Sequence, residues 1–318
     1  MAGGDGRTDC DAHGTLVAGI VAARPSATDG FSGVAPAAAI MAIRQSSLAF
    51  AARDRGGAAP GNVTTLAYAV TRAVDLGATV VNISQVACGP TGTDLGDAAL
   101  GRAVRYAFER NVVVVAAAGN VGSGSACGTQ NVPGRTATVA SPARFADYVL
   151  SVAATEPTGR PASFSLAGPW LGVAAPGTDI TSLDPRGGGL ANGQTTRDGI
   201  GPIDGTSFAA PYVAGIAALV RARFPELSAG DVVRRITSTA RHPAGGWDES
   251  VGYGVVDPVA ALTAEVAPAA PARPGRLAVP IARPRDGRPR AVALAGSAAA
   301  LLLVGVVWAA TAPRRARR

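Results

Sequence analysis

The stretch 205–220, GTSFAAPYVAGIAALV, constrains the fold more than any other part of the chain, because it predicts a helix with almost no polar face. Its larger apolar residues recur at helical spacing, and small residues fill the positions between them. These larger residues are Val213, Ile216, Leu219 and Val220. A helix of this kind requires an extensive core around it. Proline lacks the N–H that a helix interior needs, so Pro211 predicts a first turn and a helix start close to Ser207.

Ser207 is therefore expected at the positive end of a buried helix. There the helix dipole and the backbone N–H groups of the first turn can stabilise the oxyanion that forms when a serine attacks a carbonyl group. Alternatively, Ser207 or Thr206 only caps a core helix, as serine and threonine often do. The stretch alone is compatible with a nucleophile and with a cap.

Two motifs connect the chain to a known family. The stretch resembles the nucleophile motif of subtilisin-like serine proteases, GTSxAxPxVAG, at every defined position. HGTLVAGIVAA, which starts at His13, resembles the family's histidine motif, HGTxVAGxxAA. The resemblance extends over about residues 7–264 and implies that Ser207 is the nucleophile and His13 the general base and acid. Taken alone, His13 would more often be structural, and we expect His242, the other histidine, to be a solvated loop residue.

Apolar patterns predict the architecture of the domain. Helical spacing predicts helices over 64–76 and 97–110, and the largely apolar segments ATVVNIS and NVVVVAAA predict buried strands over 78–84 and 111–118. A turn followed by a strand is predicted within 31–45. Alternation of strands and helices indicates an α/β fold, a doubly wound parallel sheet with helices on both faces, whose ligand site lies at the carboxyl ends of the strands.

Two polar residues follow the predicted strands. The resemblance implies that Asn120, in AAAGN, donates its side-chain amide to the oxyanion, and that Ser84 binds the substrate chain as an added strand. Gln85 and Val86 follow Ser84 where the family has Leu and Gly, so an ordinary strand end remains an alternative for Ser84. A turn-forming asparagine is the alternative for Asn120.

A serine protease also needs a carboxylate that orients its histidine. The family carries this aspartate in an Asp-Thr-Gly or Asp-Ser-Gly motif before the histidine. Only twelve residues precede His13, and Asp5, Asp9 and Asp11 have neither the motif nor a preceding strand. We therefore expect no triad aspartate in this chain, and we expect Asp11 to order its loop. The same twelve residues contain no apolar run that predicts a signal peptide, so we expect that an N-terminal segment is missing.

The three cysteines also suggest that an N-terminal segment is missing. Cys88 and Cys127 follow neighbouring predicted strand ends, so a disulfide between them would join two active-site loops. Cys10 would then be left over, which suggests a partner in a missing segment. Three reduced thiols in a cytosolic protein are the alternative.

The basic charge belongs to the C-terminal end. The net charge is +7, yet residues 1–264 carry 19 Arg and 20 acidic residues, whereas residues 265–318 carry 10 Arg and 2 acidic residues. The main domain therefore offers no basic patch for nucleic acid. Its scattered Asp residues form no loop with the spacing of metal ligands, and we expect no metal and no cofactor.

The composition predicts four segments. They are a subtilisin-like peptidase domain over 1–264, a Pro- and Arg-rich linker over 265–290, a transmembrane helix over 291–312 and a basic cytoplasmic tail over 313–318. The 23 uncharged residues between Arg290 and Arg314 are long enough to span a bilayer core of about 30 Å. A buried helix is the alternative for this segment. The terminal PRRARR places the C-terminus in the cytoplasm by the positive-inside rule.

The combination of these features resembles the mycosins, membrane-anchored proteases of type VII secretion systems. The resemblance implies a single-pass cell-membrane protein whose extracytoplasmic peptidase domain cleaves secreted protein or peptide substrates. It also implies the type VII secretion membrane complex as a partner. The alternative is a non-catalytic scaffold with a subtilisin fold that stabilises a secretion complex, because the triad aspartate is absent. The cleavage specificity is not predicted by these motifs.

Overall fold

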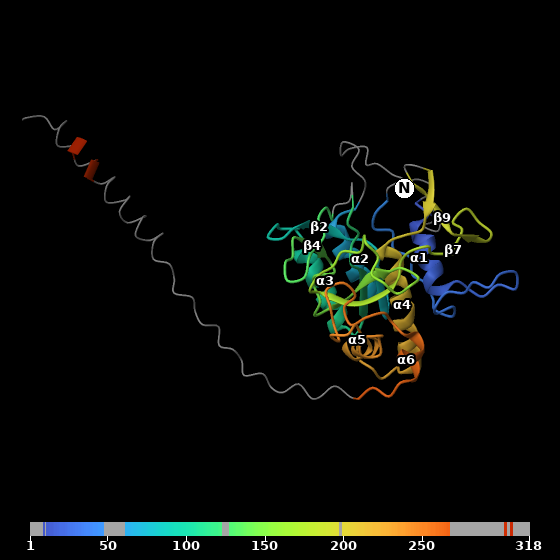
Figure 1. Cartoon of the computed structure of the whole chain (residues 1–318). Helices are drawn as coiled ribbons and strands as arrows, with labels where there is room; N and C mark the ends of the chain where they lie inside the picture. Colours follow the sequence, from blue (N-terminus) through green and yellow to red (C-terminus); the bar gives the residue numbers. More distant parts are fainter. Residues whose placement is uncertain are drawn as a thin grey trace, which may run out of the picture. The chain divides into compact units, whose positions relative to one another are not determined.

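In the computed structural model of the chain, the described residues are 9, 11–47, 61–122, 127–196, 199–267, 302–303 and 306–307. The chain divides into two units, Met1–Ala267 and Pro268–Arg318. The labelled helices and strands all belong to the first unit (Figure 1).

A sheet of four parallel strands forms the centre of the first unit. In spatial order, its strands are β1 (Val80–Ile83), β3 (Val113–Ala117), β5 (Val149–Thr155) and β6 (Leu171–Pro176). β1 and β3 are the strands predicted over 78–84 and 111–118, and Val80 lies opposite Val113. The carboxyl ends of these strands therefore lie at one edge of the sheet, followed by the segments that contain Ser84 and Asn120.

Helices cover both faces of the sheet. They are α2 (Val63–Asp75) and α3 (Ala98–Glu109) on one face, and α4 (Thr206–Arg223), α5 (Ala229–Ser238) and α6 (Pro258–Thr263) on the other. Alternate side chains of a strand point to opposite faces, so Val113 and Val115 pack toward α4 whereas Val114 packs toward α2 and α3. The predicted α/β architecture is confirmed, and the helices predicted over 64–76 and 97–110 are α2 and α3.

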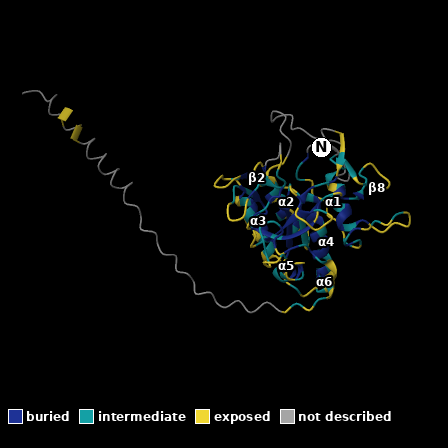
Figure 2. Ribbon diagram, viewed as in Figure 1, coloured by how far each residue is buried: buried dark blue, intermediate teal, exposed yellow. Residues whose placement is uncertain are grey.

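α4 is buried on nearly all sides, as its apolar sequence predicts (Figure 2). It packs against β1, β3, β5 and β6, against α5 and α6, and against α1 (His13–Ala22). Val213, Ile216 and Val220 belong to the large core that α4 forms with the sheet. Each such side chain contributes about 1.5–3 kcal/mol when it is fully buried, so α4 is a principal source of stability.

The prediction that Pro211 lies in a first turn is wrong. α4 begins at Thr206, close to Ser207 as expected, but Pro211 lies inside the helix. An interior proline removes the hydrogen bond to the carbonyl four residues earlier and crowds that carbonyl with its ring. The affected carbonyl is that of Ser207.

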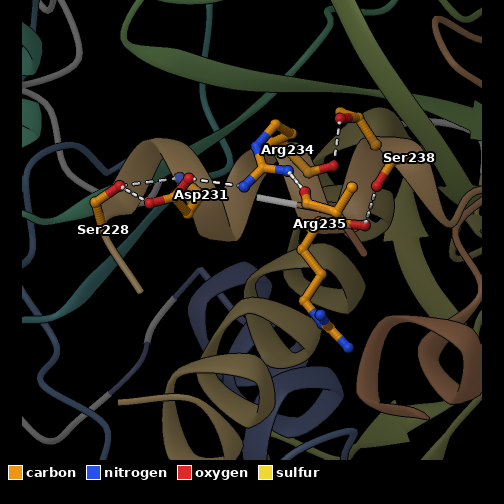
Figure 3. A network of polar contacts seen from close by, with 7 residues as sticks. Ser228, Asp231, Arg234, Arg235 and Ser238 are labelled. Carbon is orange, nitrogen blue, oxygen red and sulfur yellow. Dashed lines mark hydrogen bonds and ion pairs between the residues drawn. The ribbon is translucent and has the colours of Figure 1, made fainter. Parts of the chain in front are cut away.

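α5 begins at an N-cap serine, Ser228. Ser228 Oγ accepts a hydrogen bond from Asp231 N at 3.1 Å and donates one to Asp231 Oδ2 at 2.6 Å. Figure 3 shows how these contacts continue to Arg234, whose guanidinium donates to Asp231 Oδ1 at 2.8 Å. Arg235, the next residue, donates to carbonyls of α6 and its C-cap, Ala261 O and Ala264 O, each at 2.6 Å. The contacts of Arg235 join α5 to α6 on the face of the sheet that both helices cover.

Short antiparallel pairs occupy the loops around the sheet. They are β2 (Ala87–Pro90) with β4 (Thr138–Ser141), β7 (Ser182–Leu183) with β8 (Leu190–Ala191), and β9 (Gly193–Thr196) with β10 (Gly199–Pro202). The last two pairs lie in the glycine-rich stretch before α4, where alternating apolar patterns are too weak to predict strands. Ile203 then enters a small core with Leu16 and Ile20 of α1.

The strand predicted within 31–45 is not formed. The residues from 38 to 47 have no regular secondary structure, and Ile40, Met41 and Ile43 are 50%, 46% and 37% exposed. A strand is stabilised by backbone hydrogen bonds to a neighbour, and within the described ranges no strand pairs with this segment. Its apolar composition alone therefore does not produce a strand.

The predicted membrane span lies almost entirely outside the described residues. Within 291–312 the structure describes only 302–303 and 306–307. Over the parts of the chain that the structure describes, no helix combines the length and the apolar character that crossing a membrane requires.

Candidate active site

Ser207 lies in the first turn of α4, where the backbone changes direction at Gly205. Gly205 has a φ of 156°, a conformation that side chains rarely adopt. Its carbonyl accepts hydrogen bonds from Phe208 N at 3.0 Å and Ala209 N at 3.3 Å. The N–H of Ser207 belongs to the first turn, which has no intrahelical acceptor for it, and can point at a ligand.

The position of Gly205 shows how close Ser207 and Asn120 are. A Cβ added to Gly205 would lie 3.1 Å from Ser207 Oγ and 3.2 Å from Asn120 Nδ2. A nucleophile candidate and an amide donor thus border the same small space, which only glycine leaves open. The structure brings these two predicted residues together from segments 87 positions apart.

Thr206 determines which way the Asn120 amide faces. Asn120 Oδ1 accepts hydrogen bonds from Thr206 N at 3.0 Å and from Thr206 Oγ1 at 2.7 Å. Thr206 Oγ1 in turn accepts from Gly119 N at 3.1 Å. Because the oxygen of the amide is occupied by two donors, Nδ2 is the atom that faces Ser207 Oγ. Sequence analysis considered Thr206 only as a cap, although its hydroxyl directly before the nucleophile was the available signal.

His13 is the first residue of α1, and its ring packs on Phe208, the residue after Ser207. The two ring centroids are 5.1 Å apart. Burial lowers the pKa of His13 below its ordinary value of 6.5, and the carboxylates of Asp9 and Asp11 raise it in part. His13 is therefore neutral at pH 7, the state in which an imidazole can accept a proton.

Asp9 orders the start of α1, a role that the sequence analysis missed. Its carboxylate accepts hydrogen bonds from Asp11 N and Ala12 N, each at 3.1 Å, and from Thr15 N and Thr15 Oγ1, each at 2.7 Å. These contacts hold Ala12 at a φ of 65°, which is strained for alanine, and so fix the residue before His13. Asp11, expected to order this loop, accepts a hydrogen bond from Ser47 Oγ at 2.6 Å. An aspartate shortly before a helix was the signal for this cap.

Ser84 follows β1 and contacts the nucleophile segment. Ser84 Oγ donates a hydrogen bond to the backbone carbonyl of Ser207 at 2.6 Å and accepts one from Asn82 Nδ2 at 2.9 Å. The side chain of Ser84 is therefore engaged with Ser207. A role of Ser84 in substrate binding stays a prediction.

The predicted disulfide is present between Cys88 and Cys127, whose Cα atoms are 4.9 Å apart. It lies against Gly119, since a Cβ there would be 3.0 Å from Cys127 Sγ and 3.5 Å from Cys88 Sγ. Gly119 has a φ of 109° and directly precedes Asn120. The disulfide thus supports the backbone that carries the amide.

His242 lies away from these residues, in an exposed loop as predicted. Its Nδ1 is 2.7 Å from Tyr253 O and its Nε2 is 3.3 Å from Ser238 O. Among the residues that the structure describes, no group of three or more His, Cys, Asp or Glu could hold a metal ion.

Comparison with known proteins identifies the family. The model of the subtilase family, Peptidase S8, matches residues 2–254. The chain belongs to the subtilase family. This subtilase is 50% identical to Mycosin-4 of Mycobacterium tuberculosis over 329 residues, which cover 99% of the chain and 72% of that relative. It is 46% identical to Mycosin-3 of the same organism over 346 residues, which cover 99% of the chain and 74% of Mycosin-3.

Solved structures agree with this assignment. A crystal structure of MycP1 with the N-terminal propeptide removed is 43% identical, has a TM-score of 0.75 and matches 84% of this subtilase and 83% of that chain. A structure of an intact ESX-5 inner membrane complex contains a chain that is 44% identical, with a TM-score of 0.78, over 98% of this subtilase and 79% of that chain. The subtilase is therefore a serine protease of the mycosin type.

Proposed function

We propose that the chain is an endopeptidase that cleaves protein substrates through an acyl-enzyme on Ser207. One observation carries this proposal: Ser207 Oγ and Asn120 Nδ2 border a single point at the start of α4, within 3.1 and 3.2 Å of it. A substrate carbonyl bound beside these two atoms would have a nucleophile and an amide donor within reach, as acyl transfer requires.

The reaction follows from the roles of three residues. His13 takes the proton of the Ser207 hydroxyl as its oxygen attacks the substrate carbonyl, and it then gives this proton to the leaving amine. The Asn120 amide and the Ser207 N–H stabilise the oxyanion. Water then hydrolyses the ester, with His13 again as base. The substrate backbone lies alongside the segment after β1, at Ser84, as an added strand.

The carboxylates near His13 assist this proton transfer. Asp9 and Asp11 raise the pKa of His13 against the effect of burial, so they favour the imidazolium that forms during attack. Neither lies in the Asp-Thr-Gly or Asp-Ser-Gly motif of the family. We therefore assign them an electrostatic contribution and not the role of the triad acid.

We further propose that the protein works at the extracytoplasmic face of the cell membrane within a type VII secretion complex, anchored by the apolar segment 291–312 with a cytoplasmic C-terminus. The relation to a chain of the ESX-5 inner membrane complex supports this location. The 23 uncharged residues between Arg290 and Arg314 support the anchor. The disulfide agrees with an oxidising compartment.

Labelling of the full chain with a fluorophosphonate probe tests the proposed chemistry. We expect covalent labelling of Ser207, detected by mass spectrometry of the peptide that contains it. Ser207→Ala should abolish labelling, and His13→Ala should reduce it by orders of magnitude because the serine loses its base. The matched control His242→Ala, which removes the other histidine, should label at the normal rate. A folded chain that does not label at Ser207 would contradict the proposal and favour the non-catalytic scaffold.

A further inference from the structure

The carbonyl of Ser207 lacks its helical partner. In an α-helix each carbonyl accepts from the N–H four residues later, and for Ser207 that residue is Pro211, which has no N–H. The proline ring also crowds this carbonyl and tilts it away from the helix axis. The nucleophile's own peptide group therefore depends on a donor outside α4.

Ser84 supplies this donor. Its hydroxyl donates to Ser207 O at 2.6 Å across the interface between α4 and the end of β1. The serine precedes the nucleophile by 123 positions, so the contact depends on the complete fold. β1 holds this contact in place, because the backbone of β1 pairs with β3. In this pairing Asn82 lies opposite Val115.

The number of available hydrogen atoms determines which groups donate and which accept around Ser84. The carbonyl of Ser207 can only accept, so the single hydroxyl hydrogen of Ser84 must lie between the two oxygens. Ser84 Oγ must then accept from Asn82, which therefore presents Nδ2 at 2.9 Å and not its oxygen. Asn82 thereby prevents Ser84 from turning its hydrogen elsewhere.

The contact of Asn82 with Ser84 leaves the other polar atom of the Asn82 amide without a partner. With Nδ2 directed at Ser84, Asn82 Oδ1 is buried without a hydrogen-bond partner. A buried acceptor without a partner destabilises the folded state, because it has lost its hydrogen bonds to water. The opposite orientation of the amide would give Oδ1 the hydroxyl of Ser84 as a partner, but would remove the donor from Ser207.

We propose that Asn82 and Ser84 are positioning residues that set the direction of the Ser207 side chain by holding its carbonyl. In this role their side chains act through the Ser207 carbonyl, whereas the added substrate strand proposed above pairs with the backbone of this segment. The peptide plane after Ser207 determines where its Cβ and Oγ point, so a free carbonyl would let the nucleophile turn away from the Asn120 amide. The proposal rests on the acyl transfer proposed for Ser207.

The test compares the rate of fluorophosphonate labelling of Ser207 in variants of the full chain, as a function of probe concentration. Ser84→Ala should lower the saturating rate about 3- to 10-fold, the effect of one hydrogen bond, and leave the half-saturating concentration unchanged. Ser84→Thr keeps the hydroxyl and should stay within about twofold of the parent chain. Asn82→Asp should lower the rate at least as much as Ser84→Ala, because a carboxylate accepts the hydrogen that Ser207 needs.

Ser151→Ala is the matched control. Ser151 Oγ donates to a backbone carbonyl, Trp170 O, at the same kind of distance, 2.7 Å, from β5 of the same sheet. Its loss should lower the melting temperature without slowing labelling. The proposal is overturned if Ser84→Ala and Ser151→Ala have equal effects on labelling, if Ser84→Thr does not restore the rate, or if only the half-saturating concentration changes, since Ser84 would then bind the probe directly.

A second measurement separates this proposal from the proposed function. In Ser84→Ala, amide hydrogen exchange in the first turn of α4 should accelerate, whether or not the chain labels. If the parent chain does not label but amide exchange is faster in Ser84→Ala, the acyl transfer proposed for Ser207 is refuted, whereas the positioning of Ser207 by Ser84 is retained. Unchanged exchange would refute the positioning role.

Discussion

The disulfide between Cys88 and Cys127 offers the strongest test of how the site is supported. It closes a loop of 39 residues, and the chain-entropy relation gives it about 4 kcal/mol of stability through its effect on the unfolded chain. We expect the double variant Cys88→Ala/Cys127→Ala to lose roughly this amount. For a domain of this size, the melting temperature should fall by roughly 8–16 °C.

The same double substitution should also affect the active site, because the disulfide contacts Gly119, the residue before Asn120. The two sulfur atoms border the face of Gly119 on which a side chain would lie, and the next residue is Asn120. Without the disulfide, the amide loses part of its support, so fluorophosphonate labelling of Ser207 should slow about tenfold. This loss is smaller than the 10²- to 10³-fold expected when the amide itself is removed. Labelling is measured well below the melting temperature, so that only folded protein contributes.

Urea unfolding of the double variant distinguishes the physical causes. If the disulfide acts on the unfolded chain, its removal exposes more surface on unfolding, and the slope of the free energy against urea concentration should increase. Cys10→Ala, which leaves the disulfide intact, should change neither stability nor labelling. A loss below about 1 kcal/mol with an unchanged slope would refute the entropic account. An unchanged labelling rate would refute the support of Asn120 by the disulfide.

Further results are expected from single substitutions and from changes in pH. Asn120→Ala should slow labelling 10²- to 10³-fold, and Thr206→Val, which removes one of the two donors to Asn120 Oδ1, should slow it by about tenfold; rapid-mixing kinetics checks both. Labelling should decline only below pH 6.5, because burial lowers the pKa of His13, and Asp11→Asn should shift the pH profile further down. Because the pKa of His13 is lowered in the folded state, the folded state binds fewer protons than the unfolded one, so unfolding experiments should show stability falling as the pH drops below about 6.5. Arg235→Met should lower the free energy of unfolding in urea by about 1–3 kcal/mol, because the carbonyls of Ala261 and Ala264 lose charged donors. It should leave labelling unchanged.

Sequence patterns were sufficient for the main architecture because it depends on local periodicity. The apolar run VVVVAAA over 112–118 favours a strand buried on both faces, and β3 is such a strand. The motifs around Ser207 and Asn120 predicted residues that the structure brings together.

The remaining features depend on contacts between distant segments, which no local pattern contains. The segment within 31–45 is apolar enough for a strand but lacks a pairing neighbour among the described strands. Pro211 was expected in a first turn because a missing N–H is usually unfavourable inside a helix, yet Ser84, far away in sequence, supplies the missing donor. Asp9 is a local exception: it lies only a few residues before α1, but its contacts with the helix require a positive φ at Ala12, which alanine does not suggest.

The place of α4 has a consequence for when the enzyme becomes active. Ser207 opens the helix that contacts every strand of the central sheet, and its neighbours Asn120, His13 and Ser84 come from three separate segments of the domain. A nascent or partly folded chain carries the serine but none of its partners in place, so it cannot hydrolyse the unfolded polypeptides around it. We therefore expect activity to appear only once the domain has folded, and we expect proteolytic fragments smaller than the domain to be inactive.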